Sequence, residues 1–103
     1  MTRVEYVLPL GENVRKRHVH ETDRGMVVAF VVQLEAFIDA TWRPIVRYDS
    51  AHGFCHIDVY RRSGESRKEE LVMSFADALT LADEDILARW EEYRYRFLEG
   101  EWP

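Results

Sequence analysis

The pattern of hydrophobic and polar positions divides the chain into a strand-rich part and a helical part. Before Ser74 the apolar residues come in short runs rich in β-branched and aromatic side chains, which is typical of β-strands. The segment Met26–Ile38 is apolar on both faces over its first half, so we expect a central strand covered on both sides. The other expected strands are residues 4–8, 14–21, 43–49 and 54–61.

After Ser74 the spacing of apolar residues changes to that of a helix. Ser74 and Asp77 form a variant of the capping box, and Gly100 is a typical stop signal. The pattern predicts one helix of roughly 23 residues, about 34 Å long. Its apolar and aromatic positions follow one another at intervals of three and four: Phe75, Leu79, Ala82, Ile86, Trp90, Tyr93 and Phe97.

Together these elements predict an α+β fold, an antiparallel β-meander of about four strands with one long C-terminal helix packed on one face. The 103 residues are expected to form a single domain, residues 1–103. Such a helix is long for a domain of this size, so we expect it to overhang the sheet. Trp90, Tyr93 and Phe97 would then pack on a second copy of the chain, which predicts a homodimer.

The composition is that of an ordinary globular domain, with 47% hydrophobic and 32% charged residues. The single cysteine, Cys55, excludes an internal disulfide and favours a reducing compartment. No uncharged run approaches the about 20 apolar residues of a membrane helix, and the first residues lack an apolar stretch of signal-peptide length. We therefore expect a cytoplasmic protein with no membrane partner.

The charge is distributed unevenly along the chain. The net charge is −5, but residues 1–68 hold 11 Lys and Arg against 9 Asp and Glu, whereas residues 69–103 hold 3 against 10. Phosphate is repelled by an acidic surface, which argues against nucleic-acid contact in the last third. Contact with RNA stays open for the first two thirds.

The polar chemistry concentrates in one predicted hairpin. If residues 50–53 form a four-residue loop, Arg47 lies opposite His56 and alternation sorts the side chains onto two faces. One face carries Arg47, Asp49, His56 and Asp58, with His52 in the adjoining loop. The other face is apolar and is expected to pack under the helix: Val46, Tyr48, Cys55, Ile57 and Val59.

These five polar residues, Arg47, Asp49, His52, His56 and Asp58, are the candidate catalytic residues. An imidazole held by a carboxylate is a good general base near neutral pH, and a guanidinium suits a phosphate or carboxylate substrate. In a metal-free RNA cleavage His56 acts as the base, His52 as the acid, Arg47 as the phosphate clamp and Asp58 as the orienting carboxylate. The alternative is a salt-bridged polar face that simply meets water.

A metal site is a second interpretation of the same hairpin. His52, His56 and Asp58 have ligand types that suit divalent metal ions. His18 and His20 share one strand face and could join such a site. The sequence leaves the metal, and any other cofactor, unknown.

The pattern Arg-Tyr-Asp-x-Ala-His-Gly-x-x-His-x-Asp at residues 47–58 resembles a family of short uncharacterised prokaryotic proteins. It is more distantly similar to the TumE family, the toxins of two-component toxin–antitoxin pairs. Arg47, Tyr48, Asp49 and Gly53 match the frame of that family, while Asp58 stands near the place of its second strand histidine. The resemblance implies an RNA-directed activity and a cognate antitoxin-like partner protein.

The sequence thus leaves three functions open. The first is a toxin-like RNA-cleaving or phosphate-binding domain that uses the polar face of the hairpin at residues 47–58. The others are a non-enzymatic homodimeric or partner-binding module and a metal-binding domain. The geometry of the hairpin tests the RNA-cleaving and the metal-binding interpretations, because both need particular side chains to converge.

Overall fold

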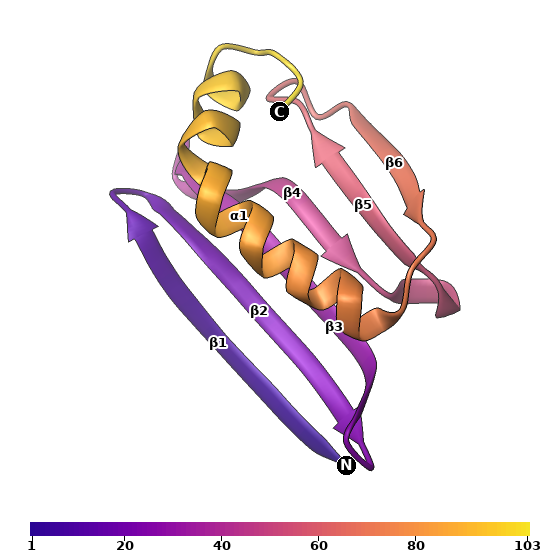
Figure 1. The fold of residues 1–103 in the computed structure, drawn as a ribbon. Helices are drawn as coiled ribbons and strands as arrows, with labels where there is room; N and C mark the ends of the chain where they lie inside the picture. Colours follow the sequence, from indigo (N-terminus) through magenta and orange to yellow (C-terminus); the bar gives the residue numbers. More distant parts are fainter.

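The computed structural model describes all 103 residues and shows one helix packed on one face of an antiparallel sheet (Figure 1). Each strand pairs with the next along the chain, so the strand order is that of the sequence. The elements are β1 (Thr2–Gly11), β2 (Val14–Asp23), β3 (Met26–Ile38), β4 (Thr41–Asp49), the short 3-10 turn η1 (Ala51–Gly53), β5 (Cys55–Tyr60), β6 (Ser66–Leu71) and α1 (Phe75–Leu98).

The predicted fold class is confirmed in kind, but the sheet has six strands and not about four. The missed strand, β6, has the sequence Ser-Arg-Lys-Glu-Glu-Leu and almost no apolar side chain. It forms an edge that needs only backbone pairing with β5, from Cys55 opposite Leu71 to Tyr60 opposite Ser66. A strand held in this way leaves no hydrophobic alternation in the sequence.

Two of the hairpin turns are tight because both central residues adopt positive φ. These residues are Arg24 and Gly25 between β2 and β3, with φ of 52° and 78°, and Asp39 and Ala40 between β3 and β4, with φ of 52° and 64°. Two-residue turns of this hand match the twist of the flanking strands. They connect β2, β3 and β4 as antiparallel pairs whose register shifts once in each pair, at Glu21/Thr22 and at Leu34/Glu35.

The predicted helix is confirmed at both ends. The Ser74 hydroxyl accepts a hydrogen bond from the Asp77 N–H at 3.1 Å, which caps the first turn. Gly100 follows the helix with φ of 79°, and its N–H donates to the Phe97 carbonyl. The helix is not apolar enough over its length to cross a membrane.

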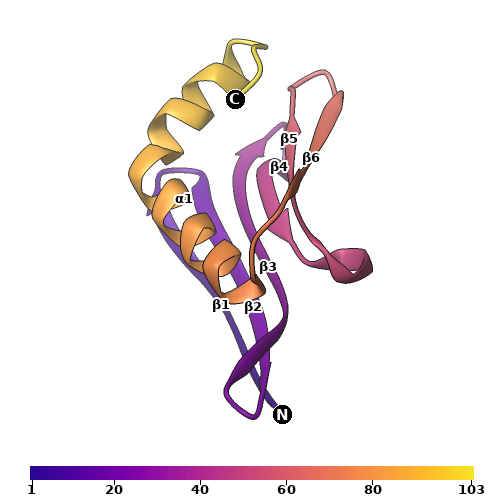
Figure 2. The same cartoon turned by 45° about the vertical axis from the view of Figure 1, so that its right-hand side comes forward.

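The helix buries one stripe of side chains against the middle of the sheet, chiefly β3 and β4 (Figures 1 and 2). Tyr93 and Phe97 are 5% and 0% exposed within the single chain, so the expected overhang that would pack these residues on a second copy is wrong. The reason is that β3, at about 43 Å, is longer than the helix, at about 36 Å. The buried helix residues are Ala78, Ala82, Ile86, Tyr93 and Phe97.

A single carboxylate joins the helix to the sheet inside the core. Tyr48 on β4 donates its hydroxyl hydrogen to Asp85 Oδ2 at 2.7 Å, and Tyr93 on the helix donates to the same oxygen at 2.5 Å. Burial and the adjacent carboxylate raise the pKa of both tyrosines well above the ordinary value. The hydroxyls therefore stay protonated and satisfied although both side chains lie in the core, as expected for Tyr48.

A second polar contact lies under the helix at β2. Lys16 donates to Asp83 Oδ1 at 2.8 Å, and His18 Nδ1 lies 3.3 Å from the same atom. The other His18 nitrogen lies 2.6 Å from Nδ1 of His20. Burial lowers the pKa of His18; Asp83 opposes this shift, and the charges of His20 and Lys16 add to it.

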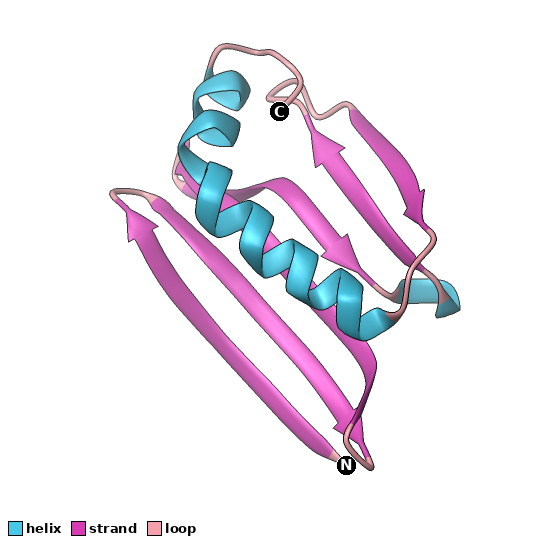
Figure 3. Ribbon diagram, viewed as in Figure 1, coloured by secondary structure: helices cyan, strands magenta, loops and turns pink.

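The face of the sheet away from the helix has no covering layer (Figure 3). The expectation that Met26–Ile38 is covered on both sides is therefore wrong for this face. Ala29 and Val31 instead line an open hollow of about 360 Å³ together with side chains of β1, β2 and β4. We refer to this side as the open face.

The Asp85 carboxylate, which accepts hydrogen bonds from both tyrosines, is expected to stabilise the fold. Asp85→Ala removes the acceptor of two buried hydroxyls, so we expect a loss of about 2–4 kcal/mol in the free energy of unfolding. Urea denaturation followed by circular dichroism measures it. Glu84→Ala, next to it on the exposed side of the helix, is the control and should change stability by no more than about 0.5 kcal/mol. Equal effects of the two substitutions would contradict the role of Asp85.

The His18 environment generates a pH prediction. Because the pKa of His18 is lower in the folded chain than its ordinary 6.5, the unfolded chain binds more protons below that pH and stability falls. His18→Gln should therefore reduce the loss of unfolding free energy between about pH 7.5 and 5.5, which lies above the range where carboxylates titrate. Urea titrations at both pH values test this, and an unchanged pH dependence would refute it.

Candidate functional site

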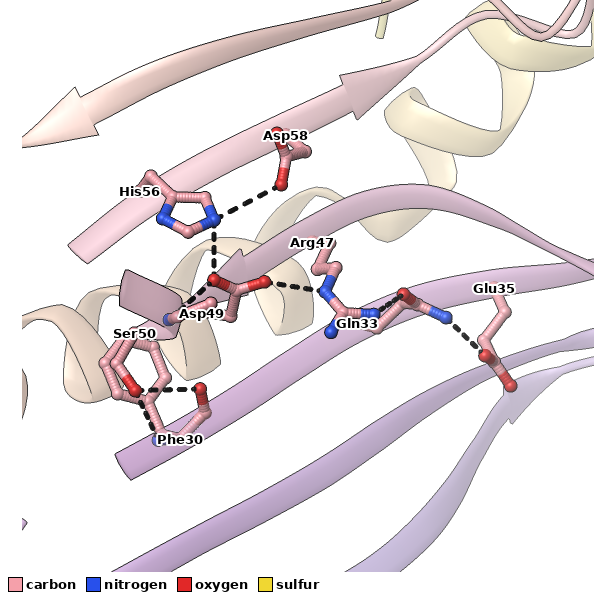
Figure 4. A network of polar contacts seen from close by, with 9 residues as sticks. Phe30, Gln33, Glu35, Arg47, Asp49, Ser50, His56 and Asp58 are labelled. Atoms are coloured by element: carbon pink, nitrogen blue, oxygen red, sulfur yellow. Dashed lines mark hydrogen bonds and ion pairs between the residues drawn. The ribbon is translucent and has the colours of Figure 1, made fainter. Parts of the chain in front are cut away.

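The candidate site lies on the open face, where β4 ends and β5 begins (Figure 4). Asp49 is the last residue of β4, and His56 and Asp58 share one face of β5 because they are two residues apart. Their side chains converge, and we call these three residues the carboxylate–imidazole cluster. Nε2 of His56 lies 2.6 Å from Asp49 Oδ1 and 3.5 Å from Asp58 Oδ2.

The three side chains of the cluster are largely buried, although no layer of structure covers the open face. The His56, Asp49 and Asp58 side chains are 2%, 5% and 13% exposed. The Phe54 ring lies 5.4 Å from the imidazole, between centroids, and contributes to this burial. Charged groups this deep are stable only when they are paired or hydrogen-bonded, and the neighbouring residues supply those partners.

Asp49 is the centre of the local hydrogen bonding. Its Oδ2 accepts from Arg47 Nε at 2.7 Å, and its Oδ1 accepts from the Ala51 N–H at 3.0 Å in addition to facing His56. The Ser50 hydroxyl accepts from the Phe30 N–H at 2.9 Å and ties the start of the loop to β3. The loop is thereby fixed to the cluster and to the sheet.

The network continues across β3 as far as Glu35 (Figure 4), which in turn accepts hydrogen bonds from Arg15 and Arg17 on β2. Arg47 donates to Gln33 Oε1 at 3.4 Å, and Gln33 donates to Glu35 at 2.6 Å. Burial alone would raise the pKa of Glu35, but the hydrogen bonds from Arg15, Gln33 and Arg17 hold it below the usual value. These hydrogen bonds keep the Glu35 carboxylate charged on a face that has no apolar cover.

The two nitrogens of the His56 imidazole lie in different surroundings. Nδ1 is buried and has no hydrogen-bond partner, whereas Nε2 faces two carboxylates. Nε2 is therefore the only ring nitrogen with acceptors beside it, and the Asp49 carboxylate is the nearer of the two. Neither nitrogen is open to a substrate, because one is engaged and the other is enclosed.

The register of the hairpin differs from the prediction by two residues. Arg47 lies opposite Asp58, and Asp49 lies opposite His56, so the expected pairing of Arg47 with His56 is wrong. The cause is a longer connection, in which η1 takes up extra residues through His52 and Gly53, with φ of 67° and 84°. A shift of two residues keeps every side chain on its predicted face.

The structure brings together four of the five predicted residues. Arg47, Asp49, His56 and Asp58 form one contact network, while His52 is exposed in η1 and bonds to none of them. The apolar face of the hairpin is confirmed, since Val46, Tyr48 and Cys55 are buried in the core with Ile57 and Val59 packed beside them.

Three residues of the site were missed by sequence reasoning. Gln33 and Glu35 are polar positions at alternate places in an otherwise apolar strand, and this signal could have placed them on the open face. Tyr60 follows Asp58 on the same side of β5. Burial raises the pKa of Tyr60, and the charges of Asp58 and Asp49 add to this against Arg47.

The two histidines proposed as additional ligands lie elsewhere. His18 and His20 face the helix, where His18 contacts Asp83, and the cluster lies on the other side of the sheet. They cannot join it. The three cluster residues alone offer one nitrogen and two oxygen atoms within 4.8 Å of one another, and these are ligand types that could hold a metal ion.

Fold and site together define a small α+β domain in which one helix covers one face of a six-stranded meander and a buried carboxylate–imidazole cluster occupies the other. A family model described as a domain of unknown function (DUF7718) matches residues 1–102, so the chain belongs to this family. No match was found among curated proteins, and none among solved structures. Membership of an uncharacterised family is thus supported, whereas nothing links the chain to TumE-type toxins.

The central position of Asp49 leads to a prediction. Asp49→Ala deprives Arg47, His56 and the Ala51 N–H of their common acceptor, so we expect a loss of about 2–3 kcal/mol in the free energy of unfolding. Chemical denaturation measures it. Glu70→Ala, an exposed carboxylate across from His56 on β6, serves as the control and should be nearly neutral. Similar stabilities for the wild-type chain and Asp49→Ala would show that the network is not a structural requirement.

Proposed function

We propose that this domain binds one divalent transition-metal ion at Asp49, His56 and Asp58. The observation that carries the proposal is the convergence of His56 Nε2, Asp49 Oδ1 and Asp58 Oδ2 on one small volume. An imidazole nitrogen combined with carboxylate oxygens suits Mn²⁺, Zn²⁺ and related ions.

The distances are close to those a metal ion requires. Ligand atoms about 2.1 Å from a metal lie about 3.0–3.4 Å from one another in octahedral or tetrahedral geometry. The separation of His56 Nε2 from Asp58 Oδ2, at 3.5 Å, lies just above this range. The separation from Asp49 Oδ1, at 2.6 Å, is that of a hydrogen bond and needs to open by less than about 1 Å.

The surroundings of the cluster also suit a cation. The two carboxylates exceed the single guanidinium of Arg47 by one negative charge, which attracts a positive ion. The Ala51 N–H and the Arg47 guanidinium orient Asp49, as outer hydrogen bonds commonly orient metal-binding carboxylates. Three protein ligands leave coordination positions for water or a small molecule.

The same geometry does not favour the metal-free cleavage of RNA. That scheme needs a free imidazole nitrogen on His56, a second histidine nearby and an unpaired guanidinium. His56 has no open nitrogen, His52 makes no contact with the cluster, and Arg47 is held by Asp49 and Gln33. A metal ion instead takes the place of a proton on Nε2, with the ring proton on Nδ1, and is held by the atoms that already converge.

The proposal predicts the effect of an isosteric substitution on metal affinity. Asp58→Asn removes one charged ligand but keeps the shape of the least buried member of the cluster. We expect the purified chain to bind one equivalent of Zn²⁺ or Mn²⁺ in calorimetric titration, and Asp58→Asn to weaken this binding by at least about tenfold.

Two variants serve as controls for this titration. Glu69→Gln makes the same change of charge on the neighbouring strand but on the opposite sheet face, and His20→Gln removes a histidine near the helix. Both should bind metal like the wild-type chain. Absence of metal binding to the wild-type chain, or equal affinity in Asp58→Asn, would rule out the proposed site.

A further inference from the structure

The outer edge of β1 is the least protected part of the sheet. β1 pairs only with β2, and nine of its ten residues are exposed, because the helix packs over β3, β4 and β5. Apolar side chains project from both of its faces. Those more than a third exposed are Val4, Tyr6, Val7 and Leu8.

The opposite edge strand, β6, carries a run of charged side chains that protects it against pairing with another strand, and β1 has no such run. β6 presents Arg67, Lys68, Glu69 and Glu70 in succession, all exposed. Consecutive charges discourage another strand from pairing with an edge, whereas a long edge with apolar side chains is a template for pairing. This difference between the two edges indicates that β1 pairs with a partner strand.

The charges on β1 identify that partner as a second copy of the chain. Arg3 and Glu5 lie on the same sheet face with Val4 between them, and Arg3 contacts Glu5 at 3.3 Å. A pair of opposite charges placed symmetrically about one residue is complementary to itself when the strand is reversed. We infer that β1 pairs antiparallel with β1 of a second copy about a two-fold axis at Val4.

Other registers of the same pairing are less favourable. Facing side chains must share a sheet face, so the axis has to pass through a residue. An axis at Val4 sets Arg3 opposite Glu5 of the second copy twice. An axis at Glu5 opposes two glutamates, and an axis at Tyr6 leaves Arg3 and Glu5 opposite Pro9 and Val7, without a charge partner.

The pairing joins two sheets into one and is independent of the metal site. In the Val4 register Thr2 faces Tyr6 of the second copy, and the two Val4 side chains meet at the axis. The paired segment in this register is residues 1–7, so the outward backbone groups of this part of β1 have partners. The carboxylate–imidazole cluster lies on β4 and β5, away from this edge, so neither proposal depends on the other.

The first test is sedimentation equilibrium of the full chain at concentrations up to roughly 100 µM, where micromolar association is populated. We expect a dimer. Arg3→Glu places like charges opposite each other twice and should weaken dimerisation by at least about tenfold, and the double variant Arg3→Glu with Glu5→Arg should restore it. Arg24→Glu, the same charge change at the exposed turn between β2 and β3, should have no effect.

The second test fixes the register by cross-linking. In the Val4 register the two copies of residue 4 have Cα atoms about 4.5–5.5 Å apart, within reach of a disulfide. The two copies of Thr2 are about 13 Å apart along the strands. We therefore expect mild oxidation to link Val4→Cys chains into covalent dimers and to leave Thr2→Cys chains unlinked. Cys55 does not compete, since it is 1% exposed.

Each alternative outcome overturns the inference. A chain that stays monomeric at every concentration excludes self-pairing, even if β1 pairs with a strand of a different protein. A dimer that is indifferent to Arg3→Glu uses another surface. A dimer that is linked through Thr2→Cys but not through Val4→Cys has another register.

Discussion

The sheet has two faces but only one helix to cover them, and the rest of the structure depends on this constraint. The helix buries its stripe over the middle strands, and Asp85 fastens it there through Tyr48 and Tyr93. No layer covers the other side. That side is stabilised by a connected series of ion pairs and hydrogen bonds from Arg15 through Glu35 to His56, because polar groups can pair with one another where apolar groups would need a cover.

The helix could be predicted almost to the residue, whereas the number of strands could not. Ser74, Gly100 and the spacing of large side chains are local signals, and local signals persist in the fold. β6 lacks any such signal, since its side chains face solvent and its backbone pairing depends on β5. The expected overhang of the helix was wrong although the bounds of β3 were predicted correctly, because β3 is longer than the helix and Tyr93 and Phe97 are buried within the single chain.

The composition of the candidate site could be predicted, but its chemistry could not. Alternation along β4 and β5 placed Arg47, Asp49, His56 and Asp58 on one face, and this survived a shift of register by two residues. What the sequence could not reveal is burial. The enclosure of His56, the engagement of both Asp49 oxygens and the isolation of His52 all depend on how the loop folds back on β3. These features favour a metal ligand over an acid–base catalyst.

The loop at η1 and the strand that follows it differ in how they tolerate changes of length. η1 is exposed and its backbone already includes two residues of unusual conformation, so homologues with longer or shorter loops there can keep the same sheet. One residue inserted between His56 and Asp58 would instead place these two side chains on opposite faces of the sheet. Natural length variation in this family should therefore accumulate in the loop and spare the six residues after it.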